Sequence, residues 1–241
     1  MLTTLVITDV TRMGGDRVCI AGIGPANTCI RPVLPSSSVR ESHLRANGAP
    51  LIFPRSKVQF DLLPIPVTPP HIEDREFDPA SILGQGVCDD EEWEATLLAS
   101  CSASVDRLYD GFLQEPRYVL PGSLTRSLGT VTNQQYISLS LGNSSFRLSF
   151  IDAVGEQYQD VQIVDINFRN YGAEQMRRYG SVDLAETRIA SVIRNARRTY
   201  LRLGLARAWA ADDGRYPAAC WLQVTGIYTF PDYQGRWGEP S

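Results

Sequence analysis

Two segments near the C-terminal end constrain the fold of this chain more than any other feature. Leucines alternate with Arg202, Gly204 and Ala206 over residues 200–207, and β-branched and aromatic residues dominate residues 220–233. Both patterns predict half-buried strands. If the strands pair, their outer face presents guanidinium, amide and ring groups that suit a planar or anionic ligand. The alternative is that the arginines are simply solvated on a sheet surface.

Further strands are predicted along the whole chain. Adjacent glycines, Gly14 and Gly15, separate two apolar runs and predict a hairpin turn. Pro32 cannot donate to a ladder, so the strand that contains Arg31 is expected at an edge or at its own end. The predicted strands cover residues 4–10, 17–23, 28–34, 57–66, 136–141, 146–151, 161–168, 200–207 and 221–229.

Two helices are predicted. Asp89 and Glu92 have the spacing of a capping box, and apolar residues then recur at helical intervals. Ser181 begins a second helix with an arginine-rich outer side. Its predicted apolar side consists of Ala185, Ile189, Val192, Ile193 and Ala196.

These elements predict a mainly β protein with some α+β character, built from two OB-like β-barrels with helical insertions. The first barrel, with an acidic helical insertion, is assigned to residues 1–115. The second, with the arginine-rich helix and the C-terminal strand pair, is assigned to residues 116–241.

Charge is distributed unevenly. The net charge is −4 and the sequence pI is about 5.3, which argues against a protein that coats nucleic acid by charge alone. Residues 73–115 hold twelve acidic residues against two arginines, a net charge of −10. Residues 169–207 hold nine arginines against three acidic residues, a net charge of +6. The two charged regions are candidate docking surfaces for a partner or for each other across a homodimer.

The five cysteines are dispersed and show no Cys-x-x-Cys spacing, which disfavours a disulfide framework and a zinc ribbon. No segment approaches the roughly 20 apolar residues of a membrane span. We therefore expect a cytoplasmic protein with no membrane contact, no metal and no cofactor.

Three local patterns together resemble the dual OB-containing domain family of bacterial proteins. They are residues 14–22 leading to residues 30–32, residues 69–74, and residues 201–207 with residues 221–232. The resemblance implies two tandem oligonucleotide/oligosaccharide-binding barrels and nucleic-acid binding within mobile-element or antiviral defence systems. It implies no known reaction.

An OB barrel binds single strands by combining a basic groove with rings on which bases stack. We therefore predict a binding module for nucleic acid, single-stranded DNA or RNA, or for a nucleotide. The predicted binding residues are Arg12, Arg17, Arg31, His71, Arg202, Arg207, Trp221, Gln223, Tyr228 and Phe230. For each ring the alternative is a place in the core.

Two other function classes remain open. His71 lies between a proline pair and two carboxylates, Glu73 and Asp74, and this set could serve a metal-dependent hydrolase or nuclease. A protein-interaction adaptor is the third class. No recognisable catalytic constellation is present, so catalysis is not predicted.

Overall fold

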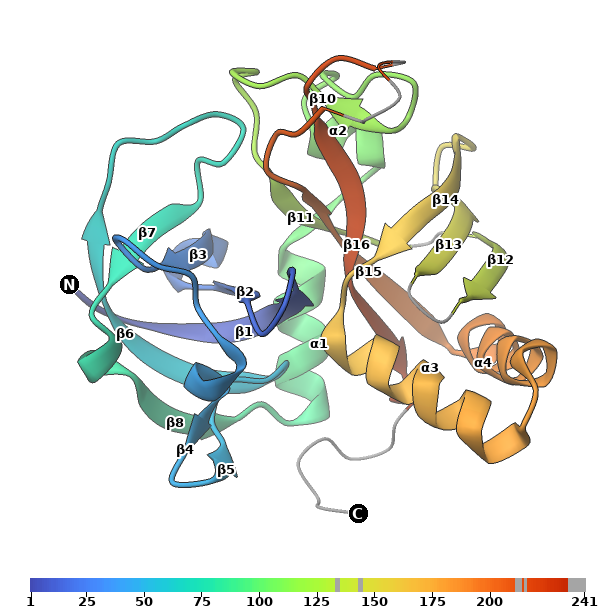
Figure 1. Ribbon diagram of the computed structural model, residues 1–241, viewed down its shortest axis with the longest axis horizontal. Coiled ribbons are helices and arrows are strands. Elements are labelled where there is room, and N and C mark those ends of the chain that lie inside the picture. Colours follow the sequence, from blue (N-terminus) through green and yellow to red (C-terminus); the bar gives the residue numbers. More distant parts are fainter. Residues whose placement is uncertain (133–134, 143–144, 211–213, 215, 234–241) are drawn as a thin grey trace.

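Two large β-sheets form the framework of the protein (Figure 1). The computed structural model describes all residues except 133–134, 143–144, 211–213, 215 and 234–241. Strands dominate and helices are few, which confirms the prediction of a mainly β protein. Within the described residues, every helix is too short or too polar to cross a membrane.

The first sheet closes into a barrel. Its strands are β1 (Leu2–Arg12), β2 (Val18–Ile23), β3 (Cys29–Val33), β6 (Ser56–Pro64), β7 (Asp74–Phe77) and β8 (Leu83–Val87). Their order is β1-β2-β3-β7-β6-β8, and β1 also pairs with β6, so five strands form a closed circuit. β3 and β7 are parallel, whereas the other pairs are antiparallel. A small hairpin, β4 (Arg45–Ala46) with β5 (Ala49–Pro50), lies outside this circuit.

The second sheet follows the same order. It contains β9 (Cys101–Ser102), β10 (Tyr118–Val119), β11 (Leu128–Thr132), β12 (Gln135–Leu141), β13 (Phe146–Ile151), β14 (Gln157–Ile163), β15 (Arg198–Leu205) and β16 (Cys220–Phe230). The ladder runs β12-β13-β14-β16-β15-β11-β9, and β14 is parallel to β16. β11 and β12 follow each other in the chain although four strands separate them in this ladder, so the sheet curls round.

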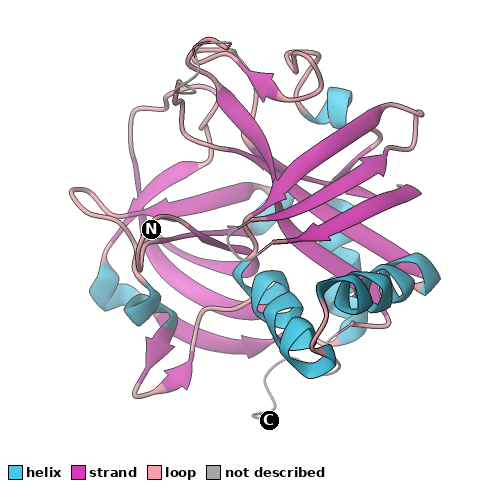
Figure 2. Ribbon diagram, turned by 45° about the vertical axis from the view of Figure 1, so that its right-hand side comes forward, coloured by secondary structure: helices cyan, strands magenta, loops and turns pink. Residues whose placement is uncertain are grey.

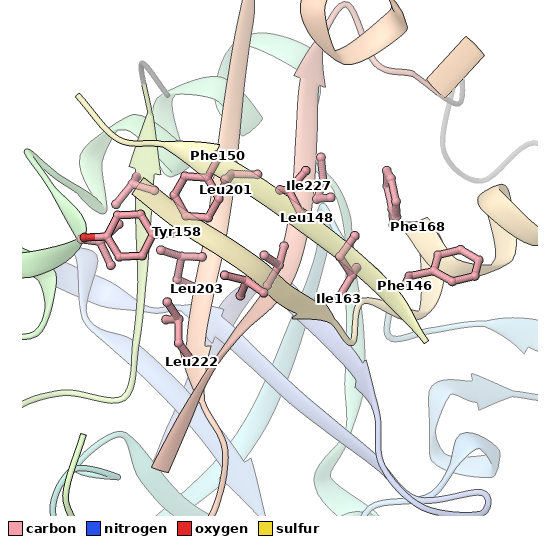
Figure 3. Packing of buried hydrophobic residues seen from close by; sticks show 14 of the residues in the cluster. Phe146, Leu148, Phe150, Tyr158, Ile163, Phe168, Leu201, Leu203, Leu222 and Ile227 are labelled. Atoms are coloured by element: carbon pink, nitrogen blue, oxygen red, sulfur yellow. The ribbon is translucent and has the colours of Figure 1, made fainter. Parts of the chain in front are cut away.

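Each sheet therefore has the strand order of an OB-like Greek-key barrel. In both, the third strand pairs in parallel with the fifth, and the fourth pairs with the first. β11 and β12 together take the place of the first strand in the second sheet. Alternating residues of β13–β16 point inward, where Leu148, Phe150, Leu203 and Ile227 pack together (Figure 3). This alternation is what the sequence pattern predicts for a half-buried strand.

Two helices, α3 (Ile166–Tyr179) and α4 (Val182–Asn195), connect β14 to β15 and lie side by side at one end of the second sheet (Figure 2). The prediction of a strand over residues 161–168 was wrong in its second half. Asp165 caps α3 there by accepting hydrogen bonds from the backbone N–H groups of Asn167 and Phe168. The helix predicted from Ser181 is confirmed as α4, although Val192 is 38% exposed.

Helix α1 (Asp90–Ala99) lies where the two sheets meet, and α2 (Val105–Leu108) follows it. Asp89 accepts a hydrogen bond from the Glu92 N–H at 2.8 Å, which confirms the predicted N-cap of this helix. Trp93 packs edge-on against Tyr228 of β16, with ring centroids 4.9 Å apart.

The acidic side chains of α1 pair with basic residues from both sheets. Glu92 binds Lys57 of β6 at 2.7 Å, and Glu94 binds Arg197 and Arg198 at 2.7 and 3.2 Å. Asp90 pairs with the buried Arg55. Part of the acidic region is therefore neutralised within the chain. The boundary predicted at residue 115 stays a prediction.

We predict that Asp165 makes stability depend on pH. Its side chain is fully buried, and burial raises its pKa from 3.8 to about 7 against the three backbone N–H groups that favour ionisation. The folded state therefore holds a proton that the unfolded state releases. The contribution of Asp165 to the free energy of unfolding is fully present below about pH 4 and is lost as pH rises through about 7. The expected loss is on the order of 2–4 kcal/mol.

Urea unfolding between pH 4 and pH 8 measures this effect. Asp165→Asn should flatten the pH dependence relative to the unmodified chain. Asp183→Asn, an exposed residue of α4, controls for the loss of one negative charge. An Asp165→Asn profile parallel to that of the unmodified chain would contradict the assignment.

Candidate functional site

Arg31 and Arg207, two of the predicted binding residues, meet on one carboxylate. Arg31 Nε lies 2.6 Å from Asp74 Oδ1, and Arg207 Nη2 lies 2.6 Å from Asp74 Oδ2. Burial disfavours the ionised carboxylate, but the two guanidiniums outweigh it and hold the pKa of Asp74 below its usual value. Arg31 is buried, whereas the Arg207 side chain is 51% exposed. Only Arg207 of this pair reaches solvent to a substantial extent.

His71 lies inside the same region. Its Nε2 is 3.9 Å from Cys220 Sγ, and its Nδ1 has no hydrogen-bond partner among the described residues. Burial, with the positive charges of Arg31 and Arg207, lowers the pKa of His71 to about 3. The imidazole is therefore neutral near pH 7 and is a weak base.

Glu73 and Asp74, the carboxylates predicted beside His71, have structural partners. Glu73 accepts hydrogen bonds from the N–H and hydroxyl of Ser127 at 2.7 and 2.8 Å and from the Leu128 N–H at 3.1 Å. In the part of the chain that the structure describes, no three His, Cys, Asp or Glu side chains form a group that could hold a metal ion. The carboxylates instead tie β7 to the start of β11.

Arg202 is fully buried between the two sheets. Its Nε and Nη2 lie 3.0 and 2.7 Å from Asp9 Oδ2, and its Nη1 donates to Thr130 Oγ1 at 3.0 Å. Nη2 also contacts Cys29 Sγ at 3.4 Å. Burial opposes the charged form, but Asp9 outweighs it and raises the pKa of Arg202. This guanidinium forms part of the joint between the sheets.

Tyr228 and Phe230, predicted as stacking rings, are also buried at this joint. The Tyr228 hydroxyl donates to the Thr8 carbonyl at 2.6 Å, and Phe230 packs edge-on against Tyr200. Neither ring is accessible to a base in this structure, because both are less than 10% exposed. Their burial follows from the second sheet packing against β1.

Arg12 is the last residue of β1, and Arg17 lies in the turn between β1 and β2. Both side chains are exposed. Arg12 forms an ion pair with Glu41 at 2.9 Å, and Arg17 Nε donates to the Gly14 carbonyl at 2.9 Å. The structure therefore does not bring them together with Arg31 or Arg207.

Trp221 and Gln223 lie on the outer face of the second sheet. Arg147 of β13 is in register with Gln162 of β14, and Gln162 is in register with Gln223 of β16. These side chains form a polar row that crosses three strands. Trp221 lies two residues before Gln223 on the same face.

A cluster of rings borders this row. Trp221 lies 5.8 Å from Trp209, 5.2 Å from Tyr216 and 5.2 Å from Tyr118, measured between ring centroids. Trp209 is held by a two-residue bridge to Ala219, and its carbonyl accepts a hydrogen bond from Trp221 Nε1 at 3.4 Å. The Trp209 side chain is nevertheless 51% exposed.

The rings and the polar row border a hollow of about 460 Å³, which we call the aromatic groove. Arg117 and Arg147 contribute two positive charges to its lining, and Asp160 contributes one negative charge. Arg147 Nη1 donates to the Asp160 carbonyl at 3.0 Å, which fixes its position. Gln159 and Gln162 add amide groups that can both donate and accept. The groove thus combines exposed ring surface, guanidiniums and amides.

Sequence reasoning missed Trp209, Tyr216, Arg117 and Arg147. Trp209 and Tyr216 lie in the connection between β15 and β16, where no periodic pattern distinguishes them from other loop residues. The available signal was their residue type, because a large ring in a polar loop next to predicted strands is a candidate ligand contact.

The corresponding outer face of the first sheet is partly occupied by its joint with the second sheet, which leaves a hollow of about 410 Å³ there. Arg31 of β3 donates to Ser127 Oγ at 3.2 Å, and Cys29 of β3 contacts Arg202. Both partners belong to the second sheet or to the segment that leads into it. Of the two equivalent faces, the one that carries the aromatic groove is free of contacts with the other sheet and presents the exposed Trp209.

Comparisons with known proteins give little further information. No protein-family model matches the chain, and no curated protein matches it. Among solved structures, the tetrameric p202 HIN2 is similar over 95% of this chain and 91% of that chain, with 12% sequence identity and a TM-score of 0.32. A likeness this distant carries no argument about function.

We predict that Arg202 is required for folding stability. Arg202→Met leaves the Asp9 carboxylate buried without its partner and should lower the free energy of unfolding by about 3–5 kcal/mol. Arg207→Met is the matched control, because Arg207 is half-exposed and Asp74 keeps Arg31; a loss of about 1 kcal/mol or less is expected.

Urea unfolding of both variants tests this difference. The double variant Asp9→Asn/Arg202→Met should recover part of the loss because it removes the uncompensated charge. Equal stability of Arg202→Met and Arg207→Met would show that the buried pair is not the main contact between the sheets.

Proposed function

We propose that this protein binds single-stranded nucleic acid in the aromatic groove. The single observation that carries the proposal is the ring cluster on an outer sheet face, where the half-exposed Trp209 and the partly exposed Trp221 lie beside Arg117 and Arg147. Single-strand binders combine such rings with a basic groove that follows the phosphates.

The position of the groove supports the same proposal. In OB-type barrels, oligonucleotides and oligosaccharides bind on the face of the second and third strands and the loops beside it. β13 and β14 hold these places in the second sheet, and the β15–β16 connection supplies Trp209. The strand order supports this position only by analogy with other folds. The side chains of the groove supply the groups that would contact a ligand.

The side chains of the groove suit the unpaired bases of a single strand better than they suit duplex DNA. Exposed rings can stack only on bases that are unpaired or unstacked, whereas a duplex offers mainly phosphates and groove edges. Gln159, Gln162 and Gln223 can form hydrogen bonds with base edges. The resemblance to the dual OB-containing domain family adds a role in bacterial mobile-element or antiviral defence systems to this proposal, on the resemblance alone.

The predicted hydrolase and adaptor functions have weaker support. Glu73 and Asp74 are occupied by Ser127, Leu128, Arg31 and Arg207, and the acidic side chains of α1 pair within the chain. We therefore assign no reaction to this site.

Fluorescence anisotropy with labelled single-stranded DNA, single-stranded RNA and duplex DNA tests the proposal. We expect a preference for a single strand, and Trp209→Ala should weaken binding by about 5- to 150-fold, because one stacked base contributes about 1–3 kcal/mol. Trp209→Phe should retain most of the affinity.

Phe112→Ala is the matched control, because Phe112 is an exposed ring that does not line the aromatic groove. A Trp209→Ala variant with unchanged affinity would remove the ring cluster from the binding site. Absence of binding to all three nucleic acids would refute the proposed function.

A further inference from the structure

A second hollow, distinct from the aromatic groove, lies between helices α3 and α4. It has a volume of about 720 Å³. From α3 it is lined by Asn167, Asn170, Tyr171 and residues one to two turns further along, so one helical stripe forms its wall. Val192 is the only aliphatic side chain in its lining.

Arginines converge in this hollow without matching acids. Arg178 and Arg188 each lie over the ring of Tyr179, at 5.8 and 5.9 Å from its centroid. Arg177 lines the same wall, and among the described residues Glu174 is the one acidic side chain in the lining. The ion pairs found among the described residues involve other arginines. Like charges held together on one ring favour an anionic ligand.

The arginine-rich surface continues across α3. A hollow of about 330 Å³ shares Asn167 and Asn170 with the first, and its lining includes Arg12 of β1, Arg45 of β4 and Glu41, which pairs with Arg12. We call the two hollows together the arginine track. A helix of the length of α3 spans roughly 20 Å, so the track can contact several successive anionic groups.

We propose that the arginine track binds the sugar–phosphate backbone of nucleic acid, as a second contact separate from the aromatic groove. The inference rests on the proposed function. The guanidinium fork matches phosphate oxygens in a bidentate way. Arg177 and Arg178 of α3 and Arg188 of α4 place three guanidiniums at one hollow, where neighbouring phosphates of one strand can reach them.

A nucleic-acid backbone fits the track better than an acidic protein does. The centre of a protein–protein interface is apolar and depleted of charge, whereas the hollow between α3 and α4 is lined mainly by arginine, amide and tyrosine side chains. Phosphate contacts position a nucleic acid and carry no sequence information. The track would therefore add affinity and salt dependence, and the aromatic groove would select unpaired bases.

An abasic single strand, which has phosphates and sugars but no bases, separates the two surfaces. Its affinity is measured by anisotropy over a series of salt concentrations beside an ordinary strand of the same length. For Arg177→Gln/Arg188→Gln we expect weaker binding of both strands. The slope of log K against log salt should fall by about 1.4, since each contact to a single strand contributes about 0.7. Trp209→Ala should weaken binding of the ordinary strand only.

Arg107→Gln/Arg126→Gln is the matched control. It removes two exposed arginines that lie outside both surfaces. We expect it to keep the slope of the unmodified chain, and thermal melting confirms that each variant is folded.

Three results would overturn the proposal. The first is an Arg177→Gln/Arg188→Gln variant that keeps the full salt slope. The second is an unmodified chain that binds the ordinary strand but not the abasic strand; this result would leave the proposed function intact. The third is binding of polyglutamate, lost in the arginine variant, with no effect of that variant on either strand. Failure to bind either strand would instead refute the proposed function itself.

Discussion

The arrangement of the two sheets depends on the buried interaction between Asp9 of β1 and Arg202 of β15. Removing an ion pair from water is costly unless every donor and acceptor is satisfied. Thr225 and Thr130 provide the further hydrogen bonds that this pair requires. Because the contacts of a guanidinium are directional, they fix how β1 lies against the second sheet. Apolar packing of α1 against β16 strengthens the joint but does not specify its orientation as strictly.

Because of this joint, the two sheets expose different faces although their strand order is the same. It uses the outer face of β3 in the first sheet, where Arg31 and Cys29 contact the second sheet. The equivalent face of β13 and β14 stays open, and the β15–β16 connection places Trp209 at its border. Burial of Arg31, Arg202 and their carboxylates thus has a structural role, and the open face carries the groups that can contact a ligand.

Local patterns predicted the elements better than they predicted the site. The Gly14–Gly15 turn and the caps at Asp89 and Ser181 involve neighbours in the sequence, and each is found as predicted. Arg202 and Arg207 occur in one strand pattern, yet the first is buried and the second is half-exposed, because burial depends on what covers the face. Helix α3 was not predicted: residues 161–168 continue the apolar pattern of a strand, and the strand ends where Asp165 caps the helix and accepts a hydrogen bond from the Ile227 N–H.

The net charge of the chain does not by itself exclude an anionic ligand. A total of −4 argues against binding an anion only if a ligand experiences the whole molecule at once. Exposed charges are screened over about 8–10 Å at physiological ionic strength, a distance shorter than α3. Several acidic groups of α1 are also neutralised locally by Lys57, Arg55, Arg197 and Arg198. A ligand at α3 therefore experiences mainly the arginines around Tyr179, so a chain that is acidic overall can present a surface that attracts phosphate.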